Sequence, residues 1–168
     1  EFGLAGRGIR VAAMIGFSID VHTLGLPTAQ GLSLTESSYW DLNDRTRALA
    51  GRLKGKMVNG IQPTSVQFQA YGAALHYLKA VEAIGLAQAK ASGLAAVEAM
   101  KRLPTDDDAF GPGSIRADGR KIHPTYLFQA KTPAESKAPW DYLKLIATTP
   151  AEQAFRPLSE GGCPFVKS

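Results

Sequence analysis

The sequence predicts an α/β fold, and three observations support this prediction. Residues 10–16 form a short apolar run between glycines, which is typical of a buried parallel strand. Residues 63–85 carry apolar side chains at helical spacing. Asp118 and Gly119 separate two alternating segments, which indicates a tight β-hairpin because glycine accepts the positive φ of the turn. Early strands followed by helices and a late hairpin favour α/β over all-α or all-β.

Composition and charge exclude several classes of function. The chain has 168 residues, of which 45% are hydrophobic and 20% are charged, as is usual for a single globular domain. Its net charge of +4 is mild, and Lys and Arg are scattered along the sequence. Nucleic-acid binding requires a clustered basic surface, so we expect no nucleic-acid partner. No apolar run in the sequence is long enough to span a bilayer.

The first part of the chain is expected to alternate strands, a loop and a helix. After the strand at residues 10–16, Phe17–His22 is predicted to be a loop at the carboxyl end of that strand. Residues 31–40 are predicted to contain a second strand and its exit segment. Residues 41–56 combine N-cap candidates with basic residues near their end, which predicts a helix.

The central part of the chain is predicted to be helical, with extended structure after it. The clearest helix is expected over residues 63–85, and a second over residues 93–103, where Pro104 ends it. Residues 106–113 are expected to form an acidic, glycine-rich loop. Residues 141–148 fit either a short strand or a helical turn.

Patterns typical of catalysis or metal binding are weak. Ser18, Asp20 and His22 have the residue types of a catalytic triad, but alternate residues of one short segment cannot easily assemble one. The histidines lack metal-ligand spacing, and we expect His76 to pack at the core or polar edge of its helix. Residues 106–108 lack the alternating ligands of a calcium loop, so a solvated loop is the better interpretation. We therefore expect no enzymatic activity, cofactor or metal.

Two further motifs have ordinary explanations. The glycines in residues 3–8 superficially suggest a phosphate-binding loop, but they precede the first predicted strand, whereas a phosphate loop follows one. A helix-to-strand turn is the better interpretation. Cys163 is the only cysteine, so no disulfide can form within the chain, and pairing with a cysteine of a longer protein stays open.

The predicted strands are few for a doubly wound domain, and the central helices have no predicted sheet to cover. The chain also begins without Met. We therefore expect it to lack an N-terminal half. Apolar helix faces would then be uncovered in this chain alone, which predicts low solubility or association with the missing half or a second copy.

A set of segments occurs in a recognisable order along the chain: Asp20–Leu26, Tyr39–Asn43, Leu75–Val81, Ile115–His123, Tyr126–Lys131, Pro133–Lys137 and Trp140–Tyr142. Their order and spacing resemble the C-terminal part of the ABC-transporter substrate-binding proteins of the branched-chain amino acid (Liv-type) family. This resemblance implies part of a type I periplasmic binding protein fold, in which two α/β lobes joined by three crossovers close around a small ligand.

The resemblance also implies a division of the chain between the lobes. Residues 1–40 would form part of the second lobe, and residues 41–112 the helical part of the first lobe. Residues 113–168 would form the hairpin and C-terminal part of the second lobe. Two hinge crossings are then expected, near Tyr39–Trp40 and near Pro112–Gly113.

One implied group of ligand contacts is Phe17, Ser18 and Asp20. They match the place where the family's amino-acid binders carry an acidic residue for the ligand ammonium group. Asp20 could bind that group through a charge-assisted hydrogen bond, or it could cap the following turn. The Phe-Ser-Ile-Asp context differs from the family's usual Pro-Glu-Gly.

The other implied group is Val66, Gln67, Phe68 and Gln69, which open the long helix where the family places a cleft-lining side chain. Amide and aromatic groups at this position would suit a planar or aromatic carboxylate. For Phe68, ordinary core packing is the competing interpretation.

The resemblance therefore implies a periplasmic solute-binding component of an ABC importer. It would bind an amino acid or a small carboxylate, aromatic ones included, between its lobes and deliver it to a membrane permease, without a cofactor. A ligand-sensing domain of a receptor or regulator is an alternative, and an α/β enzyme is a third class.

Overall fold

The chain forms two compact units, which are described separately. The computed structural model describes Leu4, residues 7–162 and Val166. Unit 1 comprises Glu1–Val66 and Thr125–Thr149, and unit 2 comprises Gln67–Pro124 and Pro150–Ser168. The chain thus passes from one unit to the other after Val66, Pro124 and Thr149. Within the described ranges, no helix has the length and apolar character needed to cross a membrane.

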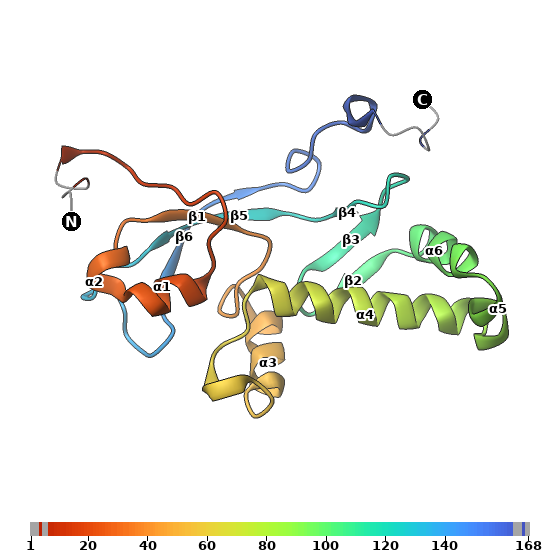
Figure 1. Ribbon diagram of the computed structural model, residues 1–168, viewed down its shortest axis with the longest axis horizontal. Coiled ribbons are helices and arrows are strands. Elements are labelled where there is room, and N and C mark those ends of the chain that lie inside the picture. The colour runs from red at the N-terminus through yellow and green to blue at the C-terminus, as the bar shows by residue number, and fades with distance from the viewer. Residues whose placement is uncertain (1–3, 5–6, 163–165, 167–168) are drawn as a thin grey trace. The chain divides into compact units, whose positions relative to one another are not determined.

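Unit 1 is built on an antiparallel sheet with the strand order β1-β5-β6 (Figure 1). The strands are β1 (Ser33–Glu36), β5 (Thr125–Ala130) and β6 (Leu143–Thr149). The helices are α1 (Ser18–Leu24), α2 (Leu26–Ala29) and α3 (Asp44–Leu53), with a 3₁₀ turn, η2, at Val58–Gly60. Leu34 of β1 lies opposite Phe128 of β5, and both are buried in the core of the unit together with Val21 of α1.

The prediction of a helix within residues 41–56 is confirmed by α3. Asn43 caps this helix because its side chain accepts a hydrogen bond from the backbone amide of Thr46 at 3.0 Å. The strand predicted within residues 31–40 is confirmed by β1. Residues 141–148, for which two structures were open, contribute to strand β6.

Two expectations about the start of unit 1 are wrong. Residues 10–16 form only an isolated parallel bridge, between Ala12 and Ser33, and Met14 is fully exposed (100%). Val11 and Ile15 of this segment are exposed as well, so its apolar side chains do not make it a buried strand. Residues 17–22 are not a loop, because α1 begins at Ser18. The Asp20 side chain accepts a hydrogen bond from the backbone amide of Phe17 at 2.8 Å, which closes the first turn of this helix.

Unit 2 contains helices, a second sheet and a final turn. The helices are α4 (Ser65–Ile84), whose first two residues belong to unit 1, α5 (Leu86–Ala91) and α6 (Gly93–Arg102). The strands β2 (Thr105–Asp107), β3 (Gly111–Ile115) and β4 (Lys121–Ile122) form an antiparallel sheet in that order. A 3₁₀ turn, η3, follows at Leu158–Gly161. Helices α4 and α6 confirm the predictions over residues 63–85 and 93–103.

The predicted hairpin is also present in unit 2. Ile115 of β3 pairs with Lys121 of β4, and Gly119 in the intervening turn has a φ of 84°, as the Asp-Gly pair predicts. The loop expected over residues 106–113 is wrong, because β2 and the start of β3 occupy it. Asp107 explains the difference, since its carboxylate accepts hydrogen bonds from the amides of Ala109 and Phe110, each at 2.9 Å, and closes the turn between these strands.

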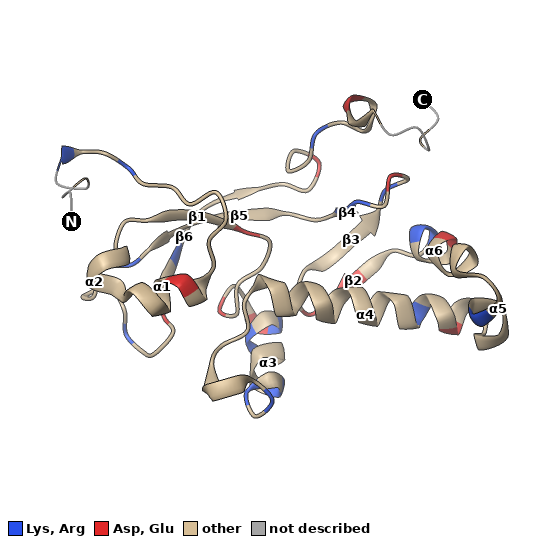
Figure 2. Cartoon of the chain, viewed as in Figure 1, with Lys and Arg blue, Asp and Glu red and all other residues tan. Residues whose placement is uncertain are grey.

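The boundaries between the units differ from the expected lobe boundaries at residues 40 and 112. Residues 41–66 group with the sheet of unit 1, and residues 113–124 group with the helices of unit 2. The assignment of each range to a lobe, and the two hinge positions, remain predictions. Figure 2 shows Lys and Arg interspersed with Asp and Glu along the chain.

Candidate functional site: a buried polar cluster at the starts of two helices

Glu36, the last residue of β1, connects the starts of two helices within unit 1. Its side chain is buried, with 3% of the residue exposed. Its carboxylate accepts a hydrogen bond from the backbone amide of Ser18 at 3.1 Å and another from the backbone amide of Ser65 at 3.4 Å. Ser18 begins α1 and Ser65 begins α4. One carboxylate therefore holds both helix starts, and the three residues are called the Glu36 cluster below.

The arrangement follows from the polarity of helix ends. The first amides of an α-helix have no partner within the helix, and a carboxylate near them is favoured by the helix dipole. In β1, Leu34 and Glu36 alternate with exposed or half-buried neighbours and are both buried. The strand therefore directs Glu36 to the interior, where the amides of Ser18 and Ser65 supply its hydrogen bonds.

The burial of Glu36 changes its acidity. Loss of solvent contact raises the pKa of its carboxyl group from 4.5 to about 7. Hydrogen bonds from Ser65 and from the Ser18 backbone oppose this rise, and the negative charge of Asp20 adds to it. The cluster therefore gains or loses a proton near neutral pH.

Ser18 contributes a buried polar atom that has no hydrogen-bond partner among the described residues. The residue is 0% exposed, and among the described residues its hydroxyl group has no hydrogen-bond partner. A buried polar group without a partner costs free energy. This hydroxyl can donate one hydrogen bond and accept others.

The other predicted residues of the first group flank the Glu36 cluster. Asp20 is exposed, and its carboxylate caps α1 through the Phe17 amide. Its capping role is thus present, whereas a ligand contact by Asp20 stays a prediction. His22 directs Nδ1 to the Tyr142 hydroxyl at 2.9 Å. Neither Asp20 nor His22 is hydrogen-bonded to the Ser18 hydroxyl. The three side chains therefore form no triad, as expected.

The second predicted group is divided by the structure. Val66 follows Ser65 and is exposed, whereas Phe68 is fully buried, as the core-packing interpretation predicts. Gln67 is half-buried, and Gln69 lines a cavity in unit 2. The backbone amides of Ser18 and of Ser65, the residue before Val66, therefore both donate to the carboxylate of Glu36. Gln67, Phe68 and Gln69 lie in unit 2.

Sequence reasoning missed Glu36 and Ser65. A signal for Glu36 exists: in Ser-Leu-Thr-Glu, the acidic residue lies two positions after Leu34 and so on the same face of the strand. An acidic residue at an inward-facing strand position is unusual unless it is paired. Nothing in the sequence indicates that Ser65, 29 residues later, is one of its partners.

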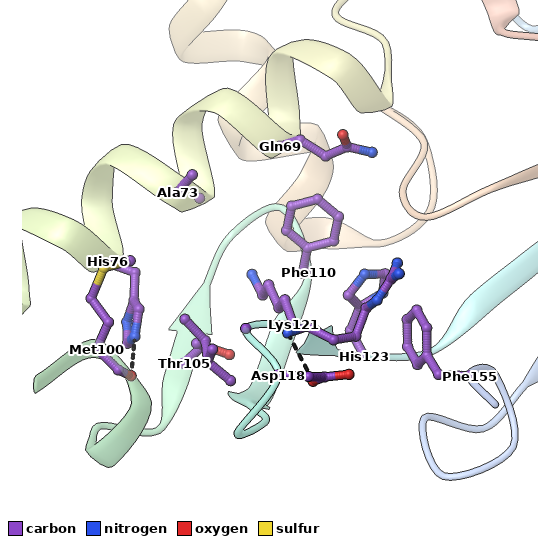
Figure 3. A pocket seen from close by; sticks show the side chains of 14 residues that line it. Gln69, Ala73, His76, Met100, Thr105, Phe110, Asp118, Lys121, His123 and Phe155 are labelled. Atoms are coloured by element: carbon purple, nitrogen blue, oxygen red, sulfur yellow. Dashed lines mark hydrogen bonds between the residues drawn. The ribbon is translucent and has the colours of Figure 1, made fainter. Parts of the chain in front are cut away.

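A cavity lies wholly within unit 2 (Figure 3). It has a volume of about 580 Å³ and lies among residues of α4, α6, the β2-β3-β4 sheet and the segment after β6. His76 of α4 is buried at its edge and its Nε2 contacts the Met100 carbonyl oxygen at 2.8 Å (Figure 3). This confirms His76 as a core histidine. In the described part of the chain, no group of His, Cys, Asp and Glu side chains could hold a metal ion.

Some predictions lie outside the described residues. These are the thiol of Cys163 and Gly3, Ala5 and Gly6 of the glycine-rich segment at residues 3–8. The predicted solvated character of residues 106–108 is wrong for Asp107, which is buried and ion-paired with Lys121 at 2.7 Å.

Comparison with known proteins gives a consistent result. Residues 1–137 match a protein family described as periplasmic binding protein. A periplasmic binding protein from Burkholderia mallei has 41% sequence identity and a TM-score of 0.84, with 97% of this chain and 42% of that chain covered. A branched chain amino acid ABC transporter periplasmic ligand-binding protein from Burkholderia xenovorans has 40% identity and a TM-score of 0.85, with 98% and 42% covered.

A more distant structure shares the fold. It is the solute binding protein of an ABC transporter from Rhodopseudomonas palustris in complex with 3,4-dihydroxybenzoic acid, with 19% identity and a TM-score of 0.67, and 88% of this chain and 40% of that chain are covered. A search of curated proteins gives no match. The chain thus spans about 42% of the length of the first two structures.

Proposed function

This chain belongs to the periplasmic binding protein family, and on that premise we propose that it is part of the solute-binding component of an ABC importer. The complete component works in the periplasm, binds a small molecule in a cleft between two lobes and delivers it to a membrane permease. The observation that carries this proposal is 40% identity, over 98% of the chain, to a periplasmic ligand-binding protein of an ABC transporter.

The proposed mechanism is closure of two lobes around the ligand. A ligand that contacts both lobes binds the closed form more tightly and so shifts the population toward it. The chain passes between units 1 and 2 three times, and segments that cross between lobes are what this mechanism uses as a hinge.

The Glu36 cluster is the proposed ligand-facing part of unit 1. Ser18 supplies the unpartnered hydroxyl group, and Asp20, two positions later, supplies an exposed carboxylate. A carboxylate suits a ligand ammonium group, and a hydroxyl suits a carboxylate or hydroxyl of the ligand. We therefore propose an amino acid or a small carboxylate, aromatic ones included. The names of the two ABC-transporter proteins above, which mention branched-chain amino acids and 3,4-dihydroxybenzoic acid, support this range.

Exposed apolar side chains support the proposal of a missing half or a second copy as a partner. In unit 1, Met14 and Ile15 are exposed, and in unit 2 Leu78, Leu86 and Leu94 are exposed. Large apolar side chains that gather into a patch in water mark surfaces that another polypeptide covers. This chain spans 42% of the length of the first two structures. The remaining length of such a protein is enough to cover these apolar side chains.

A chimera tests the proposed function. It joins the first part of the Burkholderia xenovorans protein to this chain, which replaces the matching 42%. We expect amino acids or aromatic acids to raise its melting temperature, because a ligand at a hundred times its Kd adds about 2.7 kcal/mol to the free energy of unfolding. If a folded chimera responds to no member of either class, the proposed function is wrong.

A further inference from the structure

We propose that the cavity of unit 2 is a second binding site, which takes a small aromatic carboxylate. All the residues that line it belong to unit 2, so it is separate from the Glu36 cluster in unit 1. Its volume of about 580 Å³ lies within the range of small-molecule sites, which combine apolar walls with a few polar groups. The inference does not depend on the proposed function, which concerns a cleft between lobes.

The first support is a wall of aromatic rings. The rings of Phe110 and His123 lie 5.0 Å apart, and the rings of His123 and Phe155 lie 5.4 Å apart with an edge-to-face angle of 81°. Figure 3 shows the three side chains next to one another. Arg116 fixes the segment that carries Phe155, because it donates a hydrogen bond to the carbonyl of Arg156 at 3.0 Å. These rings can pack against a planar ring of a ligand.

The second support is an excess of positive charge. Two cations line the cavity, and Lys121 is already paired with Asp107 at 2.7 Å. The carboxylate of Asp118, which also lines the cavity, pairs with Arg116 at 2.7 Å. The guanidinium of Arg120 lies 5.6 Å from the centre of the Phe155 ring, and it has no ion pair among the described residues. Arg120 can therefore bind a carboxylate through two parallel hydrogen bonds.

The third support is a polar atom without a partner. Thr105 lines the cavity and is 2% exposed, and its hydroxyl has no hydrogen-bond partner among the described residues. Next to Phe110, His123 directs Nδ1 to the Pro124 carbonyl oxygen at 2.7 Å. Because a carbonyl only accepts, Nδ1 carries the hydrogen and Nε2 is left as an acceptor in the neutral ring. A ligand with a hydroxyl group on its ring can form a hydrogen bond with the Thr105 hydroxyl.

The test uses the 168-residue chain and three probes: benzoate, cyclohexanecarboxylate and benzyl alcohol. Titration calorimetry measures each Kd. We expect benzoate to bind saturably, and the other two probes at least about tenfold more weakly, because each lacks either the aromatic ring or the charge. Equal binding of all three probes, or no binding of benzoate, would overturn the proposal.

Variants locate the bound benzoate. Arg120→Gln removes the proposed carboxylate partner, and we expect it to raise the Kd about tenfold. Arg102→Gln is the matched control, since Arg102 is an exposed arginine of α6 that does not line the cavity, and it should leave the Kd unchanged. Thr105→Val keeps the shape of the side chain and tests the hydroxyl with 4-hydroxybenzoate. The opposite result would be an unchanged Kd for benzoate in Arg120→Gln and a raised Kd in Glu36→Gln. That result would place the ligand in unit 1 and overturn the proposal.

The chimera described above distinguishes a ligand site from a surface that the rest of a longer protein covers. Binding of benzoate by the chimera, weakened by Arg120→Gln, supports the proposal. Binding by the 168-residue chain that disappears in a folded chimera would show that polypeptide fills the cavity, and it would overturn the proposal. Failure of the proposed function would leave this result unaffected, because the two sites are tested by variants of different units.

Discussion

The carboxylate of Glu36 accepts a hydrogen bond from the backbone amide of Ser18 at 3.1 Å, although 18 positions separate them in the sequence. The same carboxylate reaches Ser65, so it fixes where α1 and α4 begin. Its pKa is about 7 because it is buried. The protonation of one side chain is therefore coupled to the geometry of the segments that are proposed to contact the ligand.

Protonation of Glu36 should make the stability of unit 1 depend on pH. The folded pKa of about 7 exceeds the ordinary value of 4.5, so the folded state keeps a proton that the unfolded state has released. The stabilisation is fully present below pH 4.5 and is lost as the pH rises through 7. We expect the free energy of unfolding to fall by about 3 kcal/mol across this window from this group.

Urea unfolding followed by tryptophan fluorescence measures this effect in unit 1, because both tryptophans, Trp40 and Trp140, belong to it. The free energy of unfolding of Glu36→Gln is subtracted from that of the unaltered chain at each pH. This subtraction removes the contributions of all other groups. Glu98→Gln, at an exposed position of α6, is the matched control. A difference that stays constant with pH would show that Glu36 does not titrate in this range.

Ser18→Ala should leave the stability of unit 1 unchanged or raise it by up to about 1 kcal/mol, because it removes a buried hydroxyl that has no partner. Thr46→Ala is the matched comparison. The Thr46 hydroxyl is also buried but donates to the Asn43 carbonyl at 2.9 Å, so its loss should cost about 1 kcal/mol. Tryptophan fluorescence in urea checks both, and an equal loss in the two variants would contradict the account of Ser18.

Asp107→Ala should destabilise unit 2 by about 3 kcal/mol. The Asp107 carboxylate accepts hydrogen bonds from two backbone amides and from the ammonium group of Lys121. Its removal leaves those donors without an acceptor. Asp106→Ala, at the exposed neighbouring position of the same strand, should cost much less. Far-ultraviolet circular dichroism in urea follows the helices of unit 2, and similar losses for both variants would contradict the proposed role of Asp107.

Gly113→Ala should destabilise the β2-β3-β4 sheet by about 1–3 kcal/mol. A Cβ atom at Gly113 would lie 2.5 Å from the carbonyl oxygen of Ile122 and 2.9 Å from the Thr105 hydroxyl. Gly51→Ala within α3 meets no atom within 4 Å, so it should stabilise that helix by about 1 kcal/mol. Thermal unfolding of the two variants should shift in opposite directions, and a shift of the same sign would contradict this reasoning.

The sequence predicts the elements whose signals are local. The helix α4 has regular apolar spacing, and the β3-β4 turn has an Asp-Gly pair, so periodicity and turn chemistry suffice. Residues 10–16 show the limit of this approach. Their apolar composition predicts a buried strand, but burial depends on neighbours on both sides, and composition does not reveal which neighbours are present.

The candidate site was only partly predictable for a related reason. For Ser18 and Val66, only a resemblance predicts a place beside a ligand, and it does so one segment at a time. Glu36, which joins these segments, depends on contacts over 18 and 29 positions. Such contacts arise from tertiary packing, and no local rule of spacing indicates them.

The measurement that tests the central claim most directly is ligand affinity in the chimera carrying Ser18→Ala. The ligand is the one that stabilises the unaltered chimera, and Arg120→Gln is included in every sample to exclude the cavity of unit 2. The account predicts that Ser18→Ala raises the Kd about fivefold or more, because a hydrogen bond to the ligand is lost, while the free energy of unfolding does not fall. An unchanged Kd in a stably folded variant would contradict the placement of the ligand at the Glu36 cluster.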